Sequence, residues 1–382
     1  MQNKLTEAQL KAAFDAALVK LDAMIEKHGE LFPASSSNDL KYPTVENRGG
    51  WTQCFYTGML FLAYEYTKDK KYLDAALLHV ESFIKRVDEM LGMGDHDIGF
   101  NFTLSTVAAY KVTGDERYKE KAIAAAKVLG DRFREKGQFI QLAGDENVAD
   151  KALYRLIIDC LMNTQLLYWA GSVTGDPEFT RKGFAHFTTS METVIREDGS
   201  SFQNYYFDPA TGARLGGGTK QGLNAESCWS RGHSWAVTAI PFTYSYMKNA
   251  EIFDKYYKIT DYFIDRLPTD KVVYWDLCFT DGGEPRDSSA NAIAVCGLLE
   301  AVKNMPIDEA KKTKYAEAAE DMLYALVTDC ASFDEPECEG VIKHGTYYYA
   351  GKLGIDECCI WGDYFYMEAL MRKLNPDWKK YW

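Results

Sequence analysis

The sequence predicts an all-α protein, an (α/α)6 barrel in which six helical hairpins close into a ring and short β-like insertions occupy the loops. Apolar residues recur at three- and four-residue spacing in about twelve segments of the 382-residue chain, which is typical of helices with one buried face. Several turns between these segments share one sequence signature, which indicates a repeated helix–turn–helix unit. Twelve helices in six pairs are the number that such a ring requires.

The predicted helices follow one another along the whole chain. In order they cover residues 5–28, 52–67, 71–91, 98–113, 116–136, 152–174, 177–195, 229–247, 250–266, 288–303, 310–329 and 361–373. The insertions 136–151, 196–228 and 267–287 are rich in Gly, Asn, Asp and aromatic residues, and we expect them to form a binding rim on one face. Within them, 202–207 and 272–277 have a β-like pattern. No linker interrupts the chain, so residues 1–382 are expected to form a single domain.

The shared turn signature predicts where helices end and begin. It reads Thr-Lys-Asp at 67–69 and Thr-Gly-Asp at 113–115 and 174–176. Gly stops a helix, Asp caps the next one, and Pro177 suits a first helical turn. An aromatic residue three positions after each Asp is expected to anchor the second helix to the core. These residues are Tyr72, Tyr118 and Phe179, with Tyr315 as a weaker copy.

The composition excludes several classes of partner and site. A net charge of −13 argues against nucleic acid and anionic membranes. No run of 18 apolar residues could cross a membrane, and the N-terminus lacks the apolar core of a signal peptide. The nine cysteines form no CxxC pair and predict neither a disulfide framework nor a zinc site. A cytoplasmic location, in a reducing cytosol, is therefore expected.

Two aspartates, Asp97 and Asp159, are candidates for chemistry, and Asp159 lies in an otherwise apolar stretch. Asp97 follows His96 within HDIGF, and Asp159 lies in RLIIDCLMN, which we interpret as part of a helix. Burial raises the pKa of a carboxyl group, and a carboxyl group protonated near neutral pH is what general acid catalysis needs. The alternative for Asp159 is a structural ion pair with Arg155, four residues earlier on the same helix face. His96 could orient Asp97, bind a ligand, or play only a structural part.

A second cluster combines glycines, an arginine and tryptophans. The run GGGTKQG at 216–222 lacks the ending of a phosphate-binding loop, and its glycines more plausibly let a ligand approach the backbone. In WSRGHSW at 229–235, Arg231 offers a planar fork suited to a carboxylate, and Trp229 and Trp235 offer flat apolar faces. An acidic sugar requires this combination. Alternatively, both tryptophans are core residues and Arg231 pairs with a structural acid.

Other candidates have simpler explanations. Trp51 at a loop-to-helix junction is either a hydrophobic staple or another aromatic platform. Asp287 or Ser288, and likewise Asp363, are interpreted as helix N-caps. The six histidines show no metal-ligand spacing, and no Ser–His–Asp signature is present.

Taken together, these residues resemble the unsaturated glucuronyl hydrolases, glycoside hydrolase family 88, from about Trp51 to Trp382. The matching blocks occur in the same order: HDIGF at 96–100, RLIIDCLMN at 155–163, YYFDP at 205–209, GGTKQG at 217–222, WSRGHSW at 229–235, VVYWD at 272–276, RDSSA at 286–290 and IWGDYFYMEAL at 360–370. The resemblance implies the (α/α)6 barrel with its site at the centre, and no cofactor or metal. Lys220, and Gln203 before Asn204, occupy positions where other members can carry histidine.

The resemblance also implies the reaction. Members remove the 4,5-unsaturated uronic acid that lyases leave at the non-reducing end of glycosaminoglycan oligosaccharides such as chondroitin or hyaluronan disaccharides, by hydrating the C4=C5 vinyl ether. By the same resemblance, Asp159 protonates C4 and later activates the water, while an ionised Asp97 stabilises positive charge. Residues implied to hold the substrate are Trp51, His96, Gly217, Thr219, Gln221, Arg231 and Trp235. Lys352 could contact a sulfate on the second sugar, although the serines expected nearby are not evident.

Three alternatives stay open. An unsaturated rhamnogalacturonyl hydrolase would share the fold and chemistry but act on pectin fragments. An ordinary glycosidase on this fold would cleave saturated sugars. A helical-repeat carbohydrate-binding protein would have no activity, but it would have no reason to bury Asp159.

Overall fold

The computed structural model describes residues 4–144 and 152–382, so part of the predicted insertion 136–151 lies outside the described residues. The helices are α1 (Glu7–His28), α2 (Gln53–Thr67), α3 (Lys70–Glu89), α4 (Ile98–Phe102), α5 (Ala108–Thr113), α6 (Glu116–Asp131), α7 (Cys160–Asn163), α8 (Gln165–Thr174), α9 (Pro177–Thr193), α10 (Ser230–Met247), α11 (Phe253–Ile264), α12 (Ser288–Asn304), α13 (Glu309–Ala325) and α14 (Ile360–Leu374). A π turn, η1 (Thr103–Val107), joins α4 to α5, a 3-10 turn, η2 (Ala250–Ile252), precedes α11, and a π turn, η3 (Leu326–Cys330), follows α13. The strands are β1 (Phe32–Pro33), β2 (Thr44–Val45), β3 (Phe133–Arg134), β4 (Phe139–Ile140), β5 (Arg155–Ile157), β6 (Asn204–Phe207), β7 (Arg214–Gly218), β8 (Gly345–Tyr348) and β9 (Leu353–Glu357).

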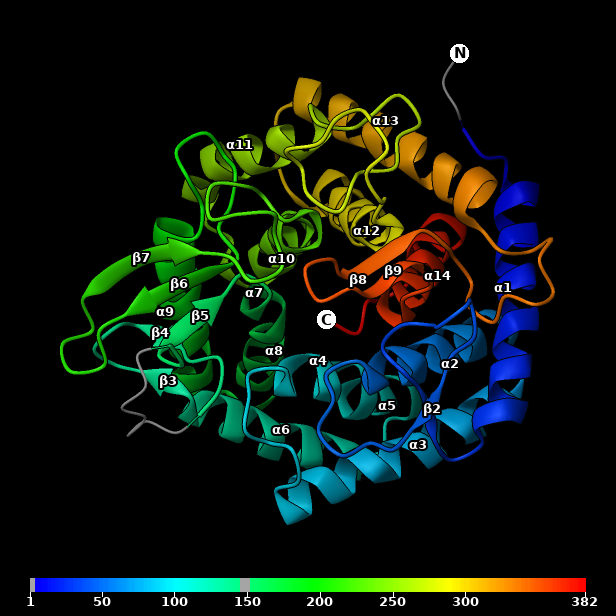
Figure 1. Cartoon of the computed structure of the whole chain (residues 1–382). Coiled ribbons are helices and arrows are strands. Elements are labelled where there is room, and N and C mark those ends of the chain that lie inside the picture. The colour runs from blue at the N-terminus through cyan, green and yellow to red at the C-terminus, as the bar shows by residue number, and fades with distance from the viewer. Residues whose placement is uncertain (1–3, 145–151) are drawn as a thin grey trace.

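The helices form a closed double ring, which confirms the predicted all-α barrel (Figure 1). In the inner ring α10 packs on α12, α12 on α14, and α14 on α2, and the circle continues through α4 and α8 back to α10. Helices α3, α6, α9, α11 and α13 pack around it, and α1 contacts α14 and α2. Helices from both ends of the chain therefore meet. That residues 1–382 form one domain stays a prediction.

The burial of each helix follows from its place in the ring. Every residue of α2 from 53 to 63 is buried, and so is every residue of α10 from 230 to 244. These helices are covered on all sides, which matches the largely apolar sequences of α2 and of α10 from Trp235 onward. The outer helix α3 instead buries one stripe, with Tyr72, Val80 and Phe83 inward and charged residues outward.

The turn signature has the predicted capping role. The carboxylates of Asp69, Asp115 and Asp176 each accept a hydrogen bond from the backbone N–H two residues later. Gly114 and Gly175 end the preceding helices in the left-handed conformation. The expected aromatic anchors are buried: Tyr72, Tyr118, Phe179 and Tyr315.

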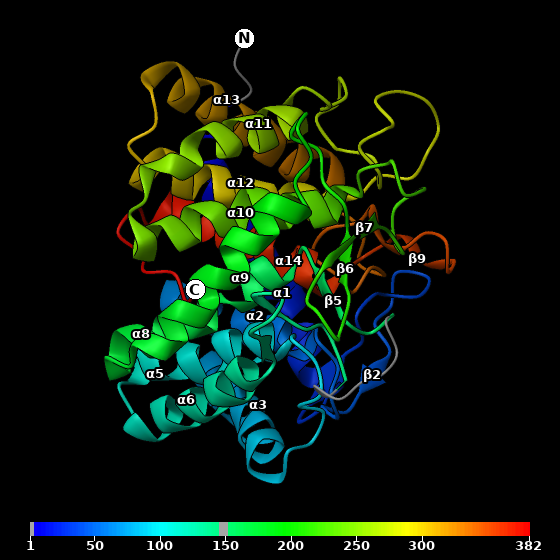
Figure 2. The same cartoon turned by 90° about the vertical axis from the view of Figure 1, so that its left-hand side faces the viewer.

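The strands gather at one end of the helical ring, as expected for a binding rim (Figure 2). Strands β5, β6 and β7 form an antiparallel sheet in which Arg155 pairs with Tyr206 and Asn204 pairs with Gly218. Strands β8 and β9 form a separate hairpin. The β-like run 202–207 is confirmed by β6, whereas 272–277 forms only the isolated bridges at Tyr274 and Asp276.

Two predictions about local structure are wrong. Residues 152–174 are not one helix, because Arg155–Ile157 pair with β6 and the first helix begins only at Cys160. Asp363 lies inside α14 rather than capping it. Its buried carboxylate accepts hydrogen bonds from the N–H groups of Val341 and Ile342 and from the hydroxyl of Tyr42.

No helix of the described residues is long and apolar enough to cross a membrane.

The N-cap of α6 provides a test of the turn signature. The Asp115 side chain accepts a hydrogen bond from the N–H of Arg117 at 2.9 Å. We expect Asp115→Ala to lower the free energy of unfolding by about 1 kcal/mol, since an N–H at the helix start loses its acceptor. Asp115→Asn, which keeps the acceptor, is the matched control and should stay near wild type in urea unfolding. Equal losses in the two variants would contradict the capping role.

Candidate active site

A cavity of about 290 Å³ lies among the strands and loops at one end of the ring. Its floor contains the starts of α4 and α7, and its walls come from β5, β6, the turn after β7, the start of α10 and the β8–β9 hairpin. The lining residues are Trp51, His96, Asp97, Leu142, Arg155, Ile157, Asp159, Gln203, Asn204, Lys220, Gln221, Trp229, Arg231, Trp235, Tyr347, Tyr348 and Leu353. Segments distant in the sequence therefore build one site.

The two aspartates occupy equivalent places. Asp97 immediately precedes α4 and Asp159 immediately precedes α7, and neither side chain caps its helix. Both carboxyl groups are thus free to face the cavity. Gly99 allows the two helix starts to approach, because a Cβ at this position would lie 2.2 Å from the carbonyl oxygen of Asn163. The glycine of the HDIGF motif is therefore required by a backbone contact.

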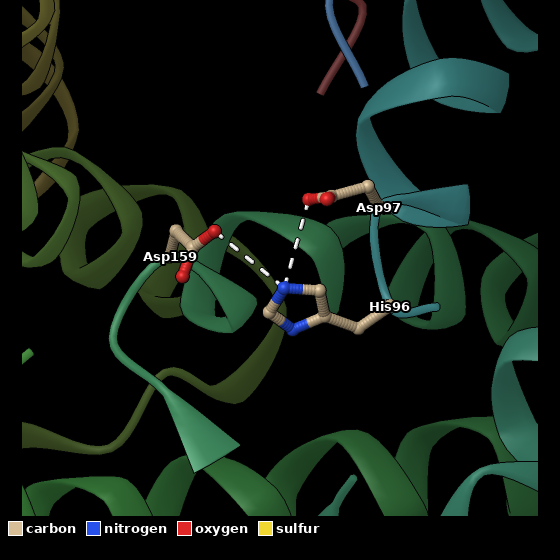
Figure 3. A group of neighbouring side chains, drawn as sticks. All are labelled: His96, Asp97 and Asp159. Atoms are coloured by element: carbon tan, nitrogen blue, oxygen red, sulfur yellow. Dashed lines mark ion pairs between the residues drawn. The ribbon is translucent and has the colours of Figure 1, made fainter. Parts of the chain in front are cut away.

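The His96 ring lies between the two carboxylates (Figure 3). Its Nε2 atom is 3.6 Å from Asp97 Oδ1 and 3.5 Å from Asp159 Oδ2. Burial lowers the pKa of His96 well below its ordinary value, and the charges of Arg132, His186 and Arg155 lower it further. His96 is therefore neutral at physiological pH, and its contacts with the aspartates are weaker than ion pairs.

Burial also raises the pKa of both aspartates. That of Asp159 rises to about 7, mainly through loss of hydration, with the positive charge of Arg231 opposing part of the shift. That of Asp97 rises well above its ordinary range through burial and through the nearby charges of Asp95 and Asp159. Because close carboxylates titrate together, the Asp97–Asp159 pair retains at least one proton near neutral pH. The ionised state expected for Asp97 stays a prediction.

Hydrogen bonds hold Asp97 and the neighbouring starts of α4 and α7 in place. Asn163 donates from Nδ2 to Asp97 Oδ1 at 3.3 Å, and its Oδ1 accepts from the N–H of Phe100 at 2.7 Å. The N–H of Asp97 donates to Asp95 Oδ1 at 3.0 Å. Asn163, the last residue of the RLIIDCLMN motif, therefore joins both helix starts. Sequence analysis missed its role, because its partner Asp97 lies 66 residues away.

Arg231 has an unexpected set of partners. Nη1 and Nη2 donate to the carbonyl oxygens of Thr346 and Tyr347, both at 2.7 Å, and Nη1 lies 3.4 Å from Asp287 Oδ2. The guanidinium also lies over the rings of Trp229 and Trp361. Pairing with a structural acid, one of our alternatives, is thus present, but the main acceptors are backbone carbonyls. Asp287 precedes α12 without capping it, so its interpretation as a side-chain N-cap is wrong.

Gln221 lines the cavity, whereas the neighbouring candidates Thr219 and Gly217 do not. Gln221 donates from Nε2 to the carbonyl of Tyr347 at 3.1 Å and accepts from Gln203 at 2.7 Å. Thr219 shapes the turn, since its hydroxyl accepts from the N–H of Gly222 at 2.7 Å. Gly217 packs on Phe202, whose ring a Cβ would overlap at 2.3 Å. The glycine run therefore serves chain packing beside the site.

The aromatic candidates differ in exposure. Trp235 lines the cavity but is buried, at 1% exposure, and packs on Phe100. Trp51 is partly exposed, packs on Trp361, and donates from Nε1 to the Tyr347 hydroxyl at 3.3 Å. Trp51 is therefore the better stacking platform of the two. Tyr347 and Tyr348 also line the cavity and were not predicted.

Cations line the cavity although the chain is strongly acidic. Arg155 and Lys220 join Arg231 on its walls. Arg155 lies in strand β5, so it does not share a helix face with Asp159. The alternative of an ion pair between them along one helix is therefore wrong. Lys352 is exposed in the turn of the β8–β9 hairpin, and the cavity lining includes its neighbour Leu353 but not Lys352.

The cavity floor also contains side chains of the types that bind metal cations. His96, Asp97 and Asp159 each offer one ligand atom, all within 4.8 Å of one another. The raised pKa values of both aspartates indicate that protons occupy this cluster near neutral pH.

Comparisons with known proteins agree along nearly the whole chain. The profile of Glycosyl Hydrolase Family 88 matches residues 25–369. An unsaturated chondroitin disaccharide hydrolase from Streptococcus pneumoniae is 43% identical over 379 residues, which are 99% of this chain and 95% of the relative. The crystal structure of an unsaturated glucuronyl hydrolase from Streptococcus agalactiae has a TM-score of 0.96 and 42% identity, covering 99% of this chain and 95% of the other. A mutant of the Streptococcus agalactiae enzyme complexed with dGlcA-GalNAc6S has a TM-score of 0.87 and 39% identity, covering 99% and 94%.

The raised pKa of Asp159 has a consequence for stability. In the unfolded chain this carboxyl ionises near its ordinary pKa of about 3.9, whereas in the folded protein the pKa is about 7. The folded state thus loses stability as pH rises from about 4 to about 7. We expect Asp159→Asn to be more stable than wild type by a few kcal/mol at about pH 8, at roughly 1.4 kcal/mol per pKa unit. The difference should shrink towards about pH 4.

Urea unfolding of the two proteins across this pH range measures the effect. The exposed Asp131→Asn serves as control and should follow wild type at every pH. A difference between Asp159→Asn and wild type that does not change with pH would contradict a raised pKa at Asp159.

Proposed function

The chain belongs to glycosyl hydrolase family 88 and is a glycoside hydrolase, and we propose that it removes the 4,5-unsaturated uronic acid from the non-reducing end of lyase-generated glycosaminoglycan oligosaccharides. Unsaturated chondroitin and hyaluronan disaccharides are the proposed substrates. The observation that carries the proposal is the Asp97–His96–Asp159 cluster, in which His96 is buried and both aspartates are partly buried. It lies on the floor of a cavity whose walls hold Arg155, Lys220 and Arg231. The named relatives support the substrate class.

The proposed chemistry begins with proton transfer from Asp159 to C4 of the unsaturated sugar. Its pKa of about 7 lets it hold a proton at neutral pH and still release it. Positive charge then develops at C5 and the ring oxygen, beside the carboxylate that Asp159 has become. This carboxylate next accepts a proton from the water that adds to C5. The resulting hemiketal opens and releases the remaining sugar.

Asp97 and His96 assist without carrying the transferred proton. Asp97 accepts a hydrogen bond from Asn163, which fixes its carboxyl at the cavity floor for contacts with sugar hydroxyls. His96 is neutral, so one ring nitrogen can accept a hydrogen bond and the other can donate one. Neither ring nitrogen has a hydrogen-bond partner within the described residues. The proposed reaction hydrates a vinyl ether instead of attacking the anomeric carbon. The distance between the two carboxylates therefore does not predict whether the anomeric configuration is retained or inverted.

Residues of the cavity walls bind the substrate in this proposal. Arg155 and Lys220 offer positive charge to the uronate carboxylate in a protein with a net charge of −13. Arg231 and Gln221 act mainly by holding Tyr347, since both donate to its carbonyl. Trp51 provides the stacking face. We also propose a cytoplasmic location, which the nine free cysteines support.

Loss of the proton carrier should abolish most of the activity. We expect Asp159→Asn to lower turnover of an unsaturated chondroitin disaccharide by at least about 10²–10⁴-fold, the usual contribution of general acid–base catalysis. Loss of the double-bond absorbance follows the reaction directly. Asp131→Asn, an exposed control, should keep wild-type activity. Wild-type cleavage of a saturated glucuronide, or of pectin-derived unsaturated disaccharides alone, would contradict the proposed substrate.

Lys352 is proposed to favour sulfated substrates. Its exposed side chain lies in the hairpin turn next to Leu353, which lines the cavity. We expect Lys352→Ala to lower turnover of a sulfated disaccharide more than that of its unsulfated counterpart, because a cation at the rim is lost. Lys68→Ala is a matched control, since Lys68 is also exposed and also has a positive φ. Equal losses on both substrates would remove this role.

A further inference from the structure

Two cysteines outside the lining of the catalytic cavity have their sulfur atoms in contact. Cys338 Sγ lies 3.4 Å from Cys358 Sγ. Cys338 belongs to the segment between η3 and β8, and Cys358 follows β9 directly. All nine cysteines lie within the described residues, and each is a free thiol.

The backbone on both sides of this pair is fixed by hydrogen bonds. Cys358 donates from its N–H to Ser37 Oγ at 2.9 Å, and its carbonyl accepts from the N–H of Ser37 at 2.9 Å. On the other side, buried Asp363 accepts from the N–H groups of Val341 and Ile342, both at 2.9 Å. Gly340 permits the close approach, because a Cβ there would lie 2.6 Å from Cys358 Sγ. The sulfur contact is therefore a consequence of the fold.

A surface cavity leads to one of the two thiols. It has a volume of about 410 Å³, lies between α1 and the segment 333–339, and includes Cys338 in its lining. Lys20 and Lys27 also line it, and Lys20 Nζ donates to the carbonyl of Cys338 at 2.6 Å. Cys338 is 1% exposed and Cys358 is fully buried. Of the two cysteines, Cys338 is the one that adjoins this cavity.

The two thiols also differ in pKa. The contact between the two sulfur atoms lowers the pKa of Cys338 to about 6, against the effect of burial. The same contact, together with burial, raises the pKa of Cys358. The lower pKa of Cys338 and its place beside the cavity make Cys338 the attacking cysteine of the pair and Cys358 the resolving one.

We propose that Cys338 and Cys358 form a peroxide-sensitive dithiol that closes to an intramolecular disulfide. Cys338 loses its proton and attacks one oxygen of hydrogen peroxide as the thiolate, and the O–O bond breaks. Cys338 sulfenic acid forms, and the leaving hydroxide takes up the released proton to become water. The Cys358 sulfur then attacks the Cys338 sulfur and displaces its hydroxyl group, which leaves as water with the Cys358 proton. Two thiols and one peroxide thus yield one disulfide and two waters. The sulfur atoms need to move from 3.4 Å to about 2.05 Å.

The disulfide would form at the base of a wall of the catalytic cavity. Cys358 lies between β9 and α14, and the β8–β9 hairpin carries Tyr347, Tyr348 and Leu353 of the cavity lining. Oxidation would therefore tie this hairpin to the segment that holds Cys338. The inference does not depend on the proposed substrate.

Peptide mapping of the folded protein tests the proposal. The protein is treated with hydrogen peroxide, free thiols are alkylated, and trypsin digestion is carried out without reductant. Cys338 and Cys330 lie in the peptide 315–343, and Cys358 and Cys359 lie in 353–372. We expect these two peptides to become linked, with a loss of two hydrogens and release by dithiothreitol.

Matched variants identify the linked pair. The link should disappear in Cys338→Ser and Cys358→Ser and persist in Cys330→Ser and Cys359→Ser, which alter the other cysteine of each peptide. Should Cys338→Ser or Cys358→Ser fail to fold, the wild type and the two controls still decide. Sulfinic acid on Cys338 without a linked peptide would overturn the proposal. So would a link that is lost in Cys330→Ser or Cys359→Ser, or complete alkylation of all nine thiols after peroxide and unfolding.

Discussion

The removal of Asp97 and Asp159 from bulk water is the constraint on which the rest of the site depends. The closed ring places the starts of α4 and α7 on the cavity floor, where neither carboxyl caps its helix. With Asp95 nearby, three carboxyl groups share a region of low hydration, so their full ionisation is unfavourable. The surrounding core stabilises the fold enough to tolerate this arrangement, and the protein gains a proton that is available at neutral pH.

The cavity walls depend on hydrogen bonds between insertions that are distant in the sequence. Gln203 contacts Gln221, Gln221 contacts the carbonyl of Tyr347, and Arg231 donates to the same carbonyl. These contacts connect the insertion 196–228 to the β8–β9 hairpin and to the start of α10. A cavity built from loops can thereby keep its shape, because each loop is held by a polar group of another.

The parts of the fold that rest on local chemistry were predictable. Helical periodicity located the inner and outer helices, and the Asp caps at 69, 115 and 176 marked their starts. The strand before Asp159 was not predictable, because a short apolar run reads equally as helix or strand until its partner β6 is known. The partners of Arg231 lie 115 and 116 residues away and are backbone atoms, which leave no trace in side-chain patterns. Thr219 and Gly217 were predicted to contact the ligand because their contacts within the protein are also invisible in the sequence. The Thr219 hydroxyl accepts a hydrogen bond within its own turn, and Gly217 packs on Phe202.

Proton sharing on the cavity floor also bears on how an acidic protein admits an acidic substrate. Three ionised carboxylates would repel a uronate, and the net charge of −13 offers no long-range attraction. A pair that retains a proton presents less negative charge, and Arg155 and Lys220 on the walls then dominate the local field. The desolvation that raises the pKa of Asp159 therefore serves two purposes, since it keeps a proton for transfer and reduces repulsion of the substrate. Both effects require Asp159 to stay shielded from water, which explains why apolar residues such as Ile157 and Trp235 line the same cavity.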